Sequence, residues 1–478
     1  MKKKLWLLLG FSILIGIILT GCQSGDSKSS GSGDSDEITI RYWNNVAAGR
    51  TYLPILIDEF EKENPRIKVD LNNVNVESSE AEYQAAISDD NLPDIFSTDS
   101  FTINELVELN LVRELNDVFP KEVRAEYTEG VFDEGNASVN GDVYLFPVYK
   151  GGTYYMFYNK NVLADLGIER VPETWADMKE ISTEIYELSN GSSYGLIFGG
   201  QSGWLVRAVT QLMSTELSPE SGYDYENGDY KYATEGYIET MKYMKDLLEN
   251  NSLSPSSLET DSTVARELFI AGQATFLLDG NWTGQLLHED GFNDWGVVKL
   301  PTKNPDGQQY GEFRLVSNDG LYVSQNTEHF DEVKIFLEFL QENMYAEILK
   351  DGEPLIAKDA AEIDVELPFE EVNDISDIFL DMSIPVPNPV VLNPDTQDVR
   401  LELQKNAPDT DIGAILMGYL TGQIDDLEGT LQKFSDDYNE VFSEAIENNE
   451  NVSREDFQFP NWTPYEPYTS EDYEELDR

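Results

Sequence analysis

The sequence predicts an α/β protein with parallel strands and more than one hydrophobic core. Residues 38–71 show a strand, a helix and a second strand in succession, which is the pattern of a βαβ unit. The same alternation of strands and amphipathic helices returns later in the chain. The 478 residues exceed what one core of ordinary size holds, so we expect at least two folded units.

The first βαβ unit is indicated by hydrophobic spacing. Apolar and polar residues alternate through 38–42 and again through 67–71, as they do in strands. Between them, the apolar positions of 53–60 recur at helical spacing. Asn64-Pro65 stops this helix, because proline cannot continue it.

A buried strand is predicted at 93–96, after a helix at 80–88. Four polar residues follow this strand, namely Ser97, Thr98, Asp99 and Ser100. In open α/β sheets, ligands bind at the carboxyl ends of the strands, so we expect part of a site here.

Further elements follow from the same reasoning. We predict helices at 161–166, 175–188, 237–248, 261–271, 333–340, 412–420 and 427–445, and a strand at 274–278. The segment 384–394 holds four prolines and is expected to be extended. Residues 359–377 are acidic and give no clear assignment, and the role of the tail 451–478 stays open.

The N-terminus has the features of an export signal. Lys2, Lys3 and Lys4 precede an apolar run from Leu5 to Leu19, which is shorter than the ~20 residues of a spanning helix. The run ends in Leu-Thr-Gly before Cys22, which resembles the lipobox of bacterial lipoproteins. This resemblance implies a signal peptide at 1–21 and a lipid on the Cys22 sulfur.

We therefore expect an extracytoplasmic protein that is lipid-anchored to the outer face of the cell membrane. Residues 22–36 are rich in Ser, Gly and Asp and are expected to form a flexible tether. An uncleaved anchor helix and an ordinary secretory peptide are the alternatives, and both also place the bulk of the chain outside the cytoplasm.

Composition excludes several functions. The 91 acidic and 32 basic residues give a formal net charge of −59, and removal of the three lysines of 1–21 would make it −62. This charge argues against nucleic acid and against docking on anionic lipid. Since Cys22 is the only cysteine and there are two histidines, we expect no disulfide within the chain, no metal site, no His-based triad and no cofactor.

Six blocks of sequence stand out in order along the chain. They are 38–60, 92–96, 144–175, 268–282, 296–301 with Gly320 and the helix 333–340, and 413–438. The most specific residues are Tyr158-Asn159-Lys160 and the Pro172-Glu173-Thr174-Trp175 that follows them. Together these blocks resemble the extracellular solute-binding proteins of ABC importers, the sugar-binding family that includes maltose-binding protein.

The resemblance implies an α/β, two-lobed type II periplasmic-binding-protein fold with a hinge of crossing strands and a ligand cleft between the lobes. Lobe one would comprise 37–149 plus 300–350, and lobe two 150–299 plus 351–478. It also implies a monomeric, non-enzymatic protein that captures a carbohydrate, an oligosaccharide, and delivers it to membrane permease subunits.

A sugar site needs aromatic rings for the apolar face of the sugar and hydrogen-bonding groups for its edges. The candidates follow predicted strands or lie on glycine-rich segments. They are Trp43, Asn44, Asp99, Ser100, Tyr149, Tyr154, Trp204, Asp279, Asn281, Trp282, Arg314 and Asn318.

Several candidates have a structural alternative. Trp43 is equally well explained as a core residue. Asp99 and Ser100 are possible caps of the helix that begins near Thr102, although a ligand role is favoured for them. Asp279 is also a possible cap. Trp175 and Trp295 are expected to be packing residues rather than ligand contacts.

Two other functions remain open. An exported glycoside hydrolase needs two carboxylates at a defined separation, and no motif marks such a pair among the acidic residues. The same fold with a peptide, a polyamine or another small solute is the second alternative, although the aromatic segments favour sugar.

Overall fold

The computed structural model describes residues 37–45, 49–74, 79–98, 101–128, 131–148, 153–214, 222–304, 307, 311–312, 320–352, 355, 357–358, 363–384, 386–408 and 410–476. Residues 38–478 form one compact unit. The other unit is Met1–Glu37, of which Glu37 alone is described and is exposed. None of the described helices combines the length and the apolar composition that crossing a bilayer requires.

The first sheet, sheet I, has five strands in the order β2-β1-β3-β14-β6. Its strands are β1 (Ile38–Asn44), β2 (Ile67–Asn73), β3 (Ile95–Phe96), β6 (Phe146–Pro147) and β14 (Gly320–Val323). β1 runs parallel to β2 and β3, and β14 is antiparallel to β3 and β6. The predicted βαβ unit is therefore confirmed.

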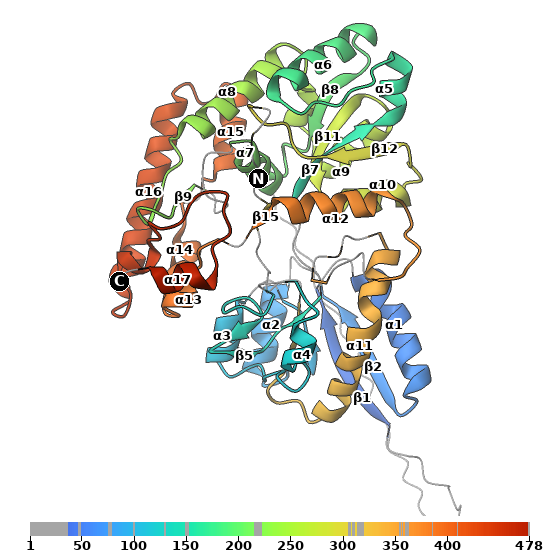
Figure 1. Cartoon of the computed structure of the whole chain (residues 1–478), viewed down its shortest axis with the longest axis vertical. Helices are drawn as coiled ribbons and strands as arrows, with labels where there is room; N and C mark the ends of the chain where they lie inside the picture. The colour runs from blue at the N-terminus through green and yellow to red at the C-terminus, as the bar shows by residue number, and fades with distance from the viewer. Residues whose placement is uncertain are drawn as a thin grey trace, which may run out of the picture. The chain divides into compact units, whose positions relative to one another are not determined.

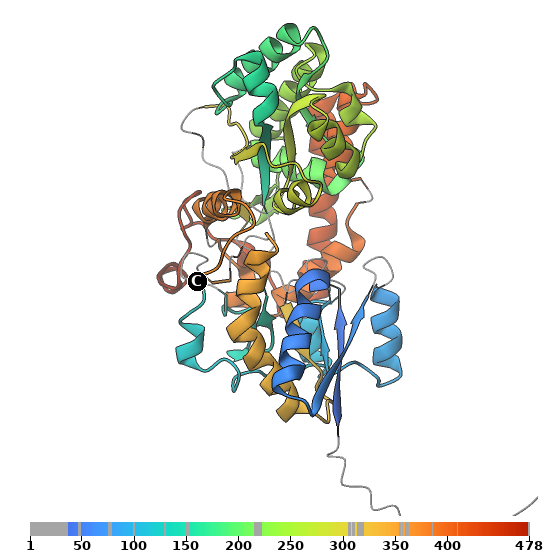
Figure 2. The same cartoon turned by 90° about the vertical axis from the view of Figure 1, so that its right-hand side faces the viewer.

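Helices cover both faces of sheet I. On one face, α1 (Gly49–Glu63) and α11 (Phe330–Lys350) form a core around Tyr42, Phe60 and Phe336 (Figure 2). On the other face, α2 (Ser79–Ser88) and α3 (Ile103–Glu108) pack against Phe96 and Tyr322. Short elements complete this part, namely α4 (Lys121–Arg124), β4 (Ser138–Val139) and β5 (Asp142–Val143).

The second sheet, sheet II, has four strands in the order β12-β7-β11-β8 (Figure 1). Its strands are β7 (Tyr154–Asn159), β8 (Tyr194–Phe198), β11 (Ala274–Gly280) and β12 (Trp295–Val298). β8 is parallel to β11, and β7 is antiparallel to both β11 and β12. All seven residues of β11 are buried, because helices cover both faces of the sheet.

Two groups of helices enclose sheet II. One face carries α6 (Trp175–Leu188), α7 (Gly203–Ser214), α8 (Glu235–Glu249), α15 (Ile412–Leu420) and α16 (Leu427–Asn448). The other carries α9 (Ser262–Ile270), α10 (Thr283–Glu289) and α12 (Glu371–Met382). α5 (Lys160–Leu166) follows β7, and the 3-10 helix η2 (Pro255–Leu258) follows α8.

The C-terminal part builds a separate aromatic cluster. It combines α13 (Pro389–Leu392), α14 (Thr396–Asn406), the 3-10 helix η5 (Arg454–Phe457) and α17 (Ser470–Glu475) with the hairpin β9 (Tyr223–Asp224) and β10 (Asp229–Tyr230). β13 (Gly311–Glu312) pairs in parallel with β15 (Ser383–Ile384).

Two details correct or complete the sequence prediction. The segment 384–394 is not wholly extended, because Pro389 begins the short helix α13, with Asn388 Oδ1 accepting a hydrogen bond from Val390 N at 3.2 Å. The acidic segment 359–377 contains the start of α12, whose residues Ile375 and Phe379 are buried. Trp295 is buried as predicted, and Trp175 packs in a stack on Tyr243.

Candidate ligand-binding site

The carboxyl ends of β1 and β3 lie side by side in sheet I, and polar residues follow both strands. Ser97 N donates to Trp43 O at 3.0 Å, and Asn45 N donates to Ser97 Oγ at 2.8 Å. These bonds join the two strand ends into one polar segment, which we call the sheet I edge (Trp43, Asn44, Asn45, Ser97 and Thr98); Trp43 is half-buried and the four polar residues are buried.

Asn44 is held firmly within this edge. Its side chain is buried, and its Nδ2 donates to Asn73 Oδ1 at 2.8 Å. A Cβ atom on Gly49 would lie 2.8 Å from Asn44 Oδ1, so glycine lets α1 begin close to this amide. Sequence analysis missed Asn73, although it too lies at the carboxyl end of a strand of sheet I.

Trp43 is half-buried and belongs to the cluster on the α2 face of sheet I. Its ring lies 5.6 Å from that of Tyr83, whose hydroxyl donates to Ser97 O at 2.5 Å. Tyr83 therefore packs on the Trp43 ring and also holds the segment that contains Ser97. Trp43 is thus partly a packing residue, although it lies at the sheet I edge.

The second candidate surface lies where β11 ends and β7 begins. Gly280, the last residue of β11, pairs with Tyr154, the first residue of β7. Asn281 and Trp282 follow Gly280 and lead into α10. We call this surface the sheet II edge (Tyr154, Asp279, Gly280, Asn281 and Trp282).

The sheet II edge contains an aromatic corner that depends on Gly280. A Cβ atom at this position would lie 2.2 Å from Trp282 Cη2, so the indole folds back over the backbone of the strand. The Trp282 and Tyr154 rings meet edge to face with centroids 6.1 Å apart. Both side chains are only half-buried.

Asp279 differs from these rings, because it is fully buried. It pairs with Tyr155 rather than Tyr154, and successive residues of a strand point to opposite faces, so its carboxyl lies on the α9 and α10 face of sheet II. Asp279 Oδ1 accepts from Gly280 N at 2.8 Å. Burial raises the pKa of Asp279 to about 6, and the hydrogen bond from Gly280 partly opposes this.

Two buried oxygens at the sheet II edge lack a hydrogen-bond partner within the described part of the chain. They are Asp279 Oδ2 and Asn281 Oδ1. Buried polar atoms are normally satisfied, so such atoms mark places where water or a ligand completes the structure.

Several predicted site residues lie outside the described residues. These are Asp99, Ser100, Tyr149, Arg314 and Asn318, together with the lipidation residue Cys22. Trp204 is the second residue of α7, but its side chain is not among those described. All of them stay predictions.

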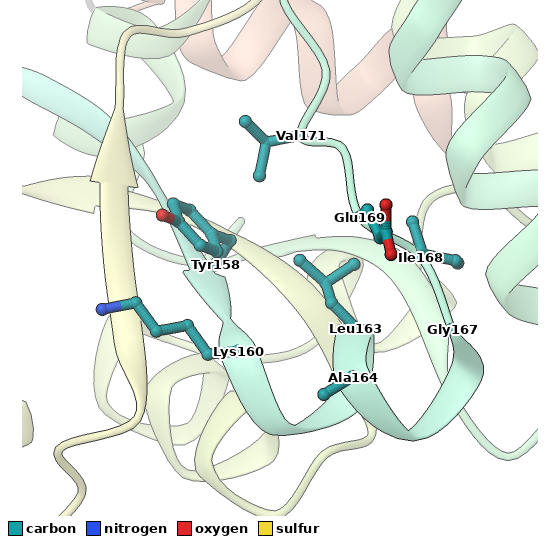
Figure 3. Close-up of a pocket in the computed structure, with 8 residues that line it drawn as sticks. All are labelled: Tyr158, Lys160, Leu163, Ala164, Gly167, Ile168, Glu169 and Val171. Carbon is teal, nitrogen blue, oxygen red and sulfur yellow. The ribbon is translucent and has the colours of Figure 1, made fainter.

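The described residues also enclose two surface hollows, and neither contains a predicted site residue. A hollow of about 490 Å³ lies beside α5, where Tyr158, Leu163 and Val171 surround it (Figure 3). Lys160 lines it too, with its Nζ 2.7 Å from Glu371 Oε1. The other, of about 290 Å³, includes Arg41 near the amino end of β1. Among the described residues, His, Cys, Asp and Glu side chains do not come together in any group of three or more that could hold a metal.

Comparison with known proteins gives the family. The family model described as bacterial extracellular solute-binding protein matches residues 43–347. The arabinooligosaccharide-binding protein of Bacillus subtilis is 23% identical over 263 residues, which is 54% of this chain and 57% of that protein. The multiple sugar-binding protein of Streptococcus mutans is 23% identical over 375 residues, covering 74% of this chain and 83% of that protein.

Solved structures agree on the fold. Unliganded RafE from Streptococcus pneumoniae superposes with a TM-score of 0.64 at 20% sequence identity, over 86% of this chain and all of that one. RafE in complex with raffinose superposes with a TM-score of 0.63, over 85% of this chain and all of that one. The expected α/β, two-lobed type II fold is therefore confirmed.

Proposed function

Because the chain belongs to the family of bacterial extracellular solute-binding proteins, we propose that it captures a carbohydrate and delivers it to the permease of an ABC transporter. The names of the two relatives, which refer to arabino-oligosaccharides and to multiple sugars, support an oligosaccharide as the ligand. The protein releases the sugar unchanged and is not an enzyme.

The aromatic corner of the sheet II edge carries this proposal. A pyranose ring has an apolar face, and covering about 100 Å² of such surface contributes about 2.5 kcal/mol. Trp282 and Tyr154 are half-buried, so each ring keeps accessible surface at the end of the strands. Trp282 stacks on the sugar in this proposal, and Tyr154 holds the indole in place.

The polar groups of the sheet I edge complement the rings. Trp43 is half-buried at these adjacent strand ends and is placed to meet a sugar, while Asn45 and Ser97 are buried and hold the two strand ends together behind it. The sugar then lies in a cleft between lobe one (37–149 plus 300–350) and lobe two (150–299 plus 351–478). The lobes close by hinge rotation, and the ligand favours closure through its higher affinity for the closed state.

Export and anchoring complete the proposal. Residues 1–21 act as the signal peptide, Cys22 carries the lipid, and 22–36 tether the folded unit to the outer face of the membrane. The support is the sequence Leu19-Thr20-Gly21-Cys22 behind three lysines. A lipid anchor would also explain how the protein stays near its permease.

Calorimetric titration against a glycan panel tests the function. The panel includes arabino-oligosaccharides, raffinose and malto-oligosaccharides, and the variants are Trp282→Ala and Trp204→Ala. Loss of the stacking surface at Trp282 raises Kd by roughly 50- to 100-fold. Unchanged affinity in both variants would refute the stacking sites.

Trp175→Ala is the matched control for this experiment. Trp175 stacks on Tyr243 with ring centroids 4.5 Å apart, and its Nε1 donates to Pro301 O at 3.1 Å. Its loss lowers stability but leaves glycan affinity unchanged. Chromatography of the glycans after long incubation gives the second readout, because cleavage products would show an enzyme instead of a binding protein.

A further inference from the structure

Asp351 joins elements from the two parts of the fold. It follows the last residue of α11, the helix that packs with α1 on sheet I. Its Oδ2 accepts a hydrogen bond from Thr51 Oγ1 in the first turn of α1. The same oxygen accepts from Gln285 Nε2 of α10, at 3.0 Å.

The Gln285 bond crosses from one core to the other. Leu287 of α10 is buried in the cluster on sheet II, together with Trp295 and Ile375. A Cβ atom on Gly284 would lie 3.0 Å from Trp295 and from Ile375, so α10 is fixed closely against that cluster. Asp351 therefore connects a helix of sheet I with a helix of sheet II.

The two donors lie in the first turns of helices that follow the two edges in the sequence. α1 begins at Gly49, four residues after Asn45 of the sheet I edge. α10 begins at Thr283, the residue after Trp282 of the sheet II edge. A shift of either helix therefore moves the segment that carries a proposed ligand contact.

The surroundings suit a specific hydrogen bond. Gln285 is 8% exposed, and its Nε2 also lies 3.2 Å from Glu289 Oε1. Asp351 is half-buried, which strengthens a charge-assisted bond compared with a pair in open water. Loss of the carboxylate would remove one of the two hydrogen bonds of the buried Gln285 amide and leave the bond to Glu289.

We propose that Asp351 is a positioning residue that, through Thr51 and Gln285, stabilises the spacing of the sheet I edge and the sheet II edge found in this conformation. It does not touch the ligand. Its effect on sugar affinity rests on the proposed function, but its effect on the spacing of the two sheets does not.

Distance measurement between spin labels tests the proposal without a ligand. Cys22→Ser first removes the only native thiol of the full chain. Glu59→Cys in α1 and Glu187→Cys in α6, at two exposed positions, then supply the thiols for the spin labels. Gln285→Leu and Asp351→Ala are expected to broaden the distance distribution and shift its mean. Distributions that superpose on that of the parent protein would overturn the proposal.

Three further variants sharpen the result. Asp351→Asn keeps an acceptor oxygen and is expected to restore a distribution close to that of the parent. Thr51→Val changes an exposed side chain and tests the same junction if Gln285→Leu does not fold. Gln432→Leu is the matched control, because it breaks an exposed amide–carboxylate bond of 2.9 Å within α16 and is expected to change nothing.

Affinity gives a second, independent result. For a glycan found in the panel, Gln285→Leu and Asp351→Ala are expected to raise Kd by about 10-fold. A shifted distance distribution with no glycan bound by the parent protein would count against the proposed function and support the positioning role. Normal glycan binding by the parent protein, with distance distributions unchanged in Gln285→Leu and Asp351→Ala, would support the proposed function and contradict the positioning role.

Discussion

The carboxyl group of Asp279 is buried without a positive partner in hydrogen-bond contact. The hydrogen bond from Gly280 N engages Oδ1, while Oδ2 has no partner among the described residues. Burial disfavours the charged form of a carboxyl group, which raises the pKa of Asp279 from its ordinary value of 3.8 to about 6. The folded chain therefore binds a proton at Asp279 more tightly than the unfolded chain does.

This difference predicts how stability depends on pH. The contribution of Asp279 is fully present below pH 3.8 and is lost as the pH rises through about 6. The loss is on the order of 3 kcal/mol. Asp279→Asn is expected to remove this dependence, so that the variant loses less stability than the parent between pH 4.5 and 7.5. Urea unfolding of the parent protein and the variant at pH 4.5 and 7.5 measures the change in the free energy of unfolding.

Asp177→Asn is the control with the opposite sign. A hydrogen bond from Thr174 lowers the pKa of Asp177, so its contribution is present above its ordinary pKa and is lost as the pH falls. Parallel pH profiles for the parent protein and Asp279→Asn would contradict the assignment to Asp279.

Asp279 also shows what sequence reasoning misses at this scale. The motif around Gly280-Asn281-Trp282 marks the strand end, and the structure places Tyr154 beside it. Only strand register shows that Asp279 lies on the other face of the sheet from Tyr154. The sequence also cannot show that Gly280 makes room for the indole, because this depends on the backbone path after the strand.

At the scale of the elements, hydrophobic spacing predicts the long helices well. α6 and α15 have the bounds expected from the sequence, and Thr174 and Asp177 form a capping box that fixes the start of α6. The two-residue strands β4, β5 and β6 are too short for a periodic signal; β4 and β5 pair with each other, and β6 depends on pairing with the distant strand β14. α13 was missed because its four residues contain Pro389, which marks a helix start as well as an extended segment.

The contact between α6 and β8 predicts a sensitive glycine. A Cβ atom on Gly195 would lie 2.0 Å from Ser182 Oγ and 2.6 Å from Ser182 Cα, so helix and strand must separate to accommodate it. Gly195→Ala is expected to destabilise the protein by about 1–3 kcal/mol, as overpacked cores do. The midpoint of urea unfolding measures this loss.

Gly203→Ala provides the matched control in the same part of the fold. Gly203 begins α7, and a Cβ atom there would meet Asp411 Oδ2 at 3.8 Å, which is ordinary van der Waals contact. The same substitution is therefore expected to be neutral or slightly stabilising, since alanine favours the helix over glycine. Equal destabilisation by both variants would show that the close approach of α6 to β8 does not decide the result.

At the scale of the whole molecule, the C-terminal tail is an integral part of the fold. Tyr223 OH donates to Phe457 O at 2.6 Å, and Phe459 N donates to Tyr225 O at 2.6 Å, so the tail is bonded to the β9–β10 hairpin. The guanidinium of Arg454 lies 4.5 Å from the ring centre of Phe442 in α16. The role of this tail could not be predicted from the sequence, because the hydrogen bonds that tie it to the β9–β10 hairpin join residues 234 positions apart.

This C-terminal cluster also reaches the part of the fold around sheet I. Asn388 N donates to the hydroxyl of Tyr473 in α17 at 2.7 Å, and Asn388 Nδ2 lies 3.4 Å from Glu134 O. The pKa of Asp398 in α14 is raised, first by burial of its carboxyl group. The negative charges of Glu108 and Glu105 in α3 also raise it. Like charges therefore face one another where α14 approaches α3, and the aromatic core of the cluster must outweigh their repulsion.

Phe459 tests whether the tail stabilises the whole chain. Its side chain is 1% exposed and packs edge to face on Tyr225 and Tyr468. Phe459→Ala is expected to cost about 3–5 kcal/mol, because it removes a large buried ring and leaves a cavity. If the tail is part of the cooperative unit, circular dichroism and tryptophan fluorescence will show one urea transition at a lower midpoint.

Leu109→Ala, at a side chain that is 59% exposed, is the control and is expected to leave the midpoint unchanged. An early, separate transition with an unshifted main transition would show instead that the tail unfolds independently.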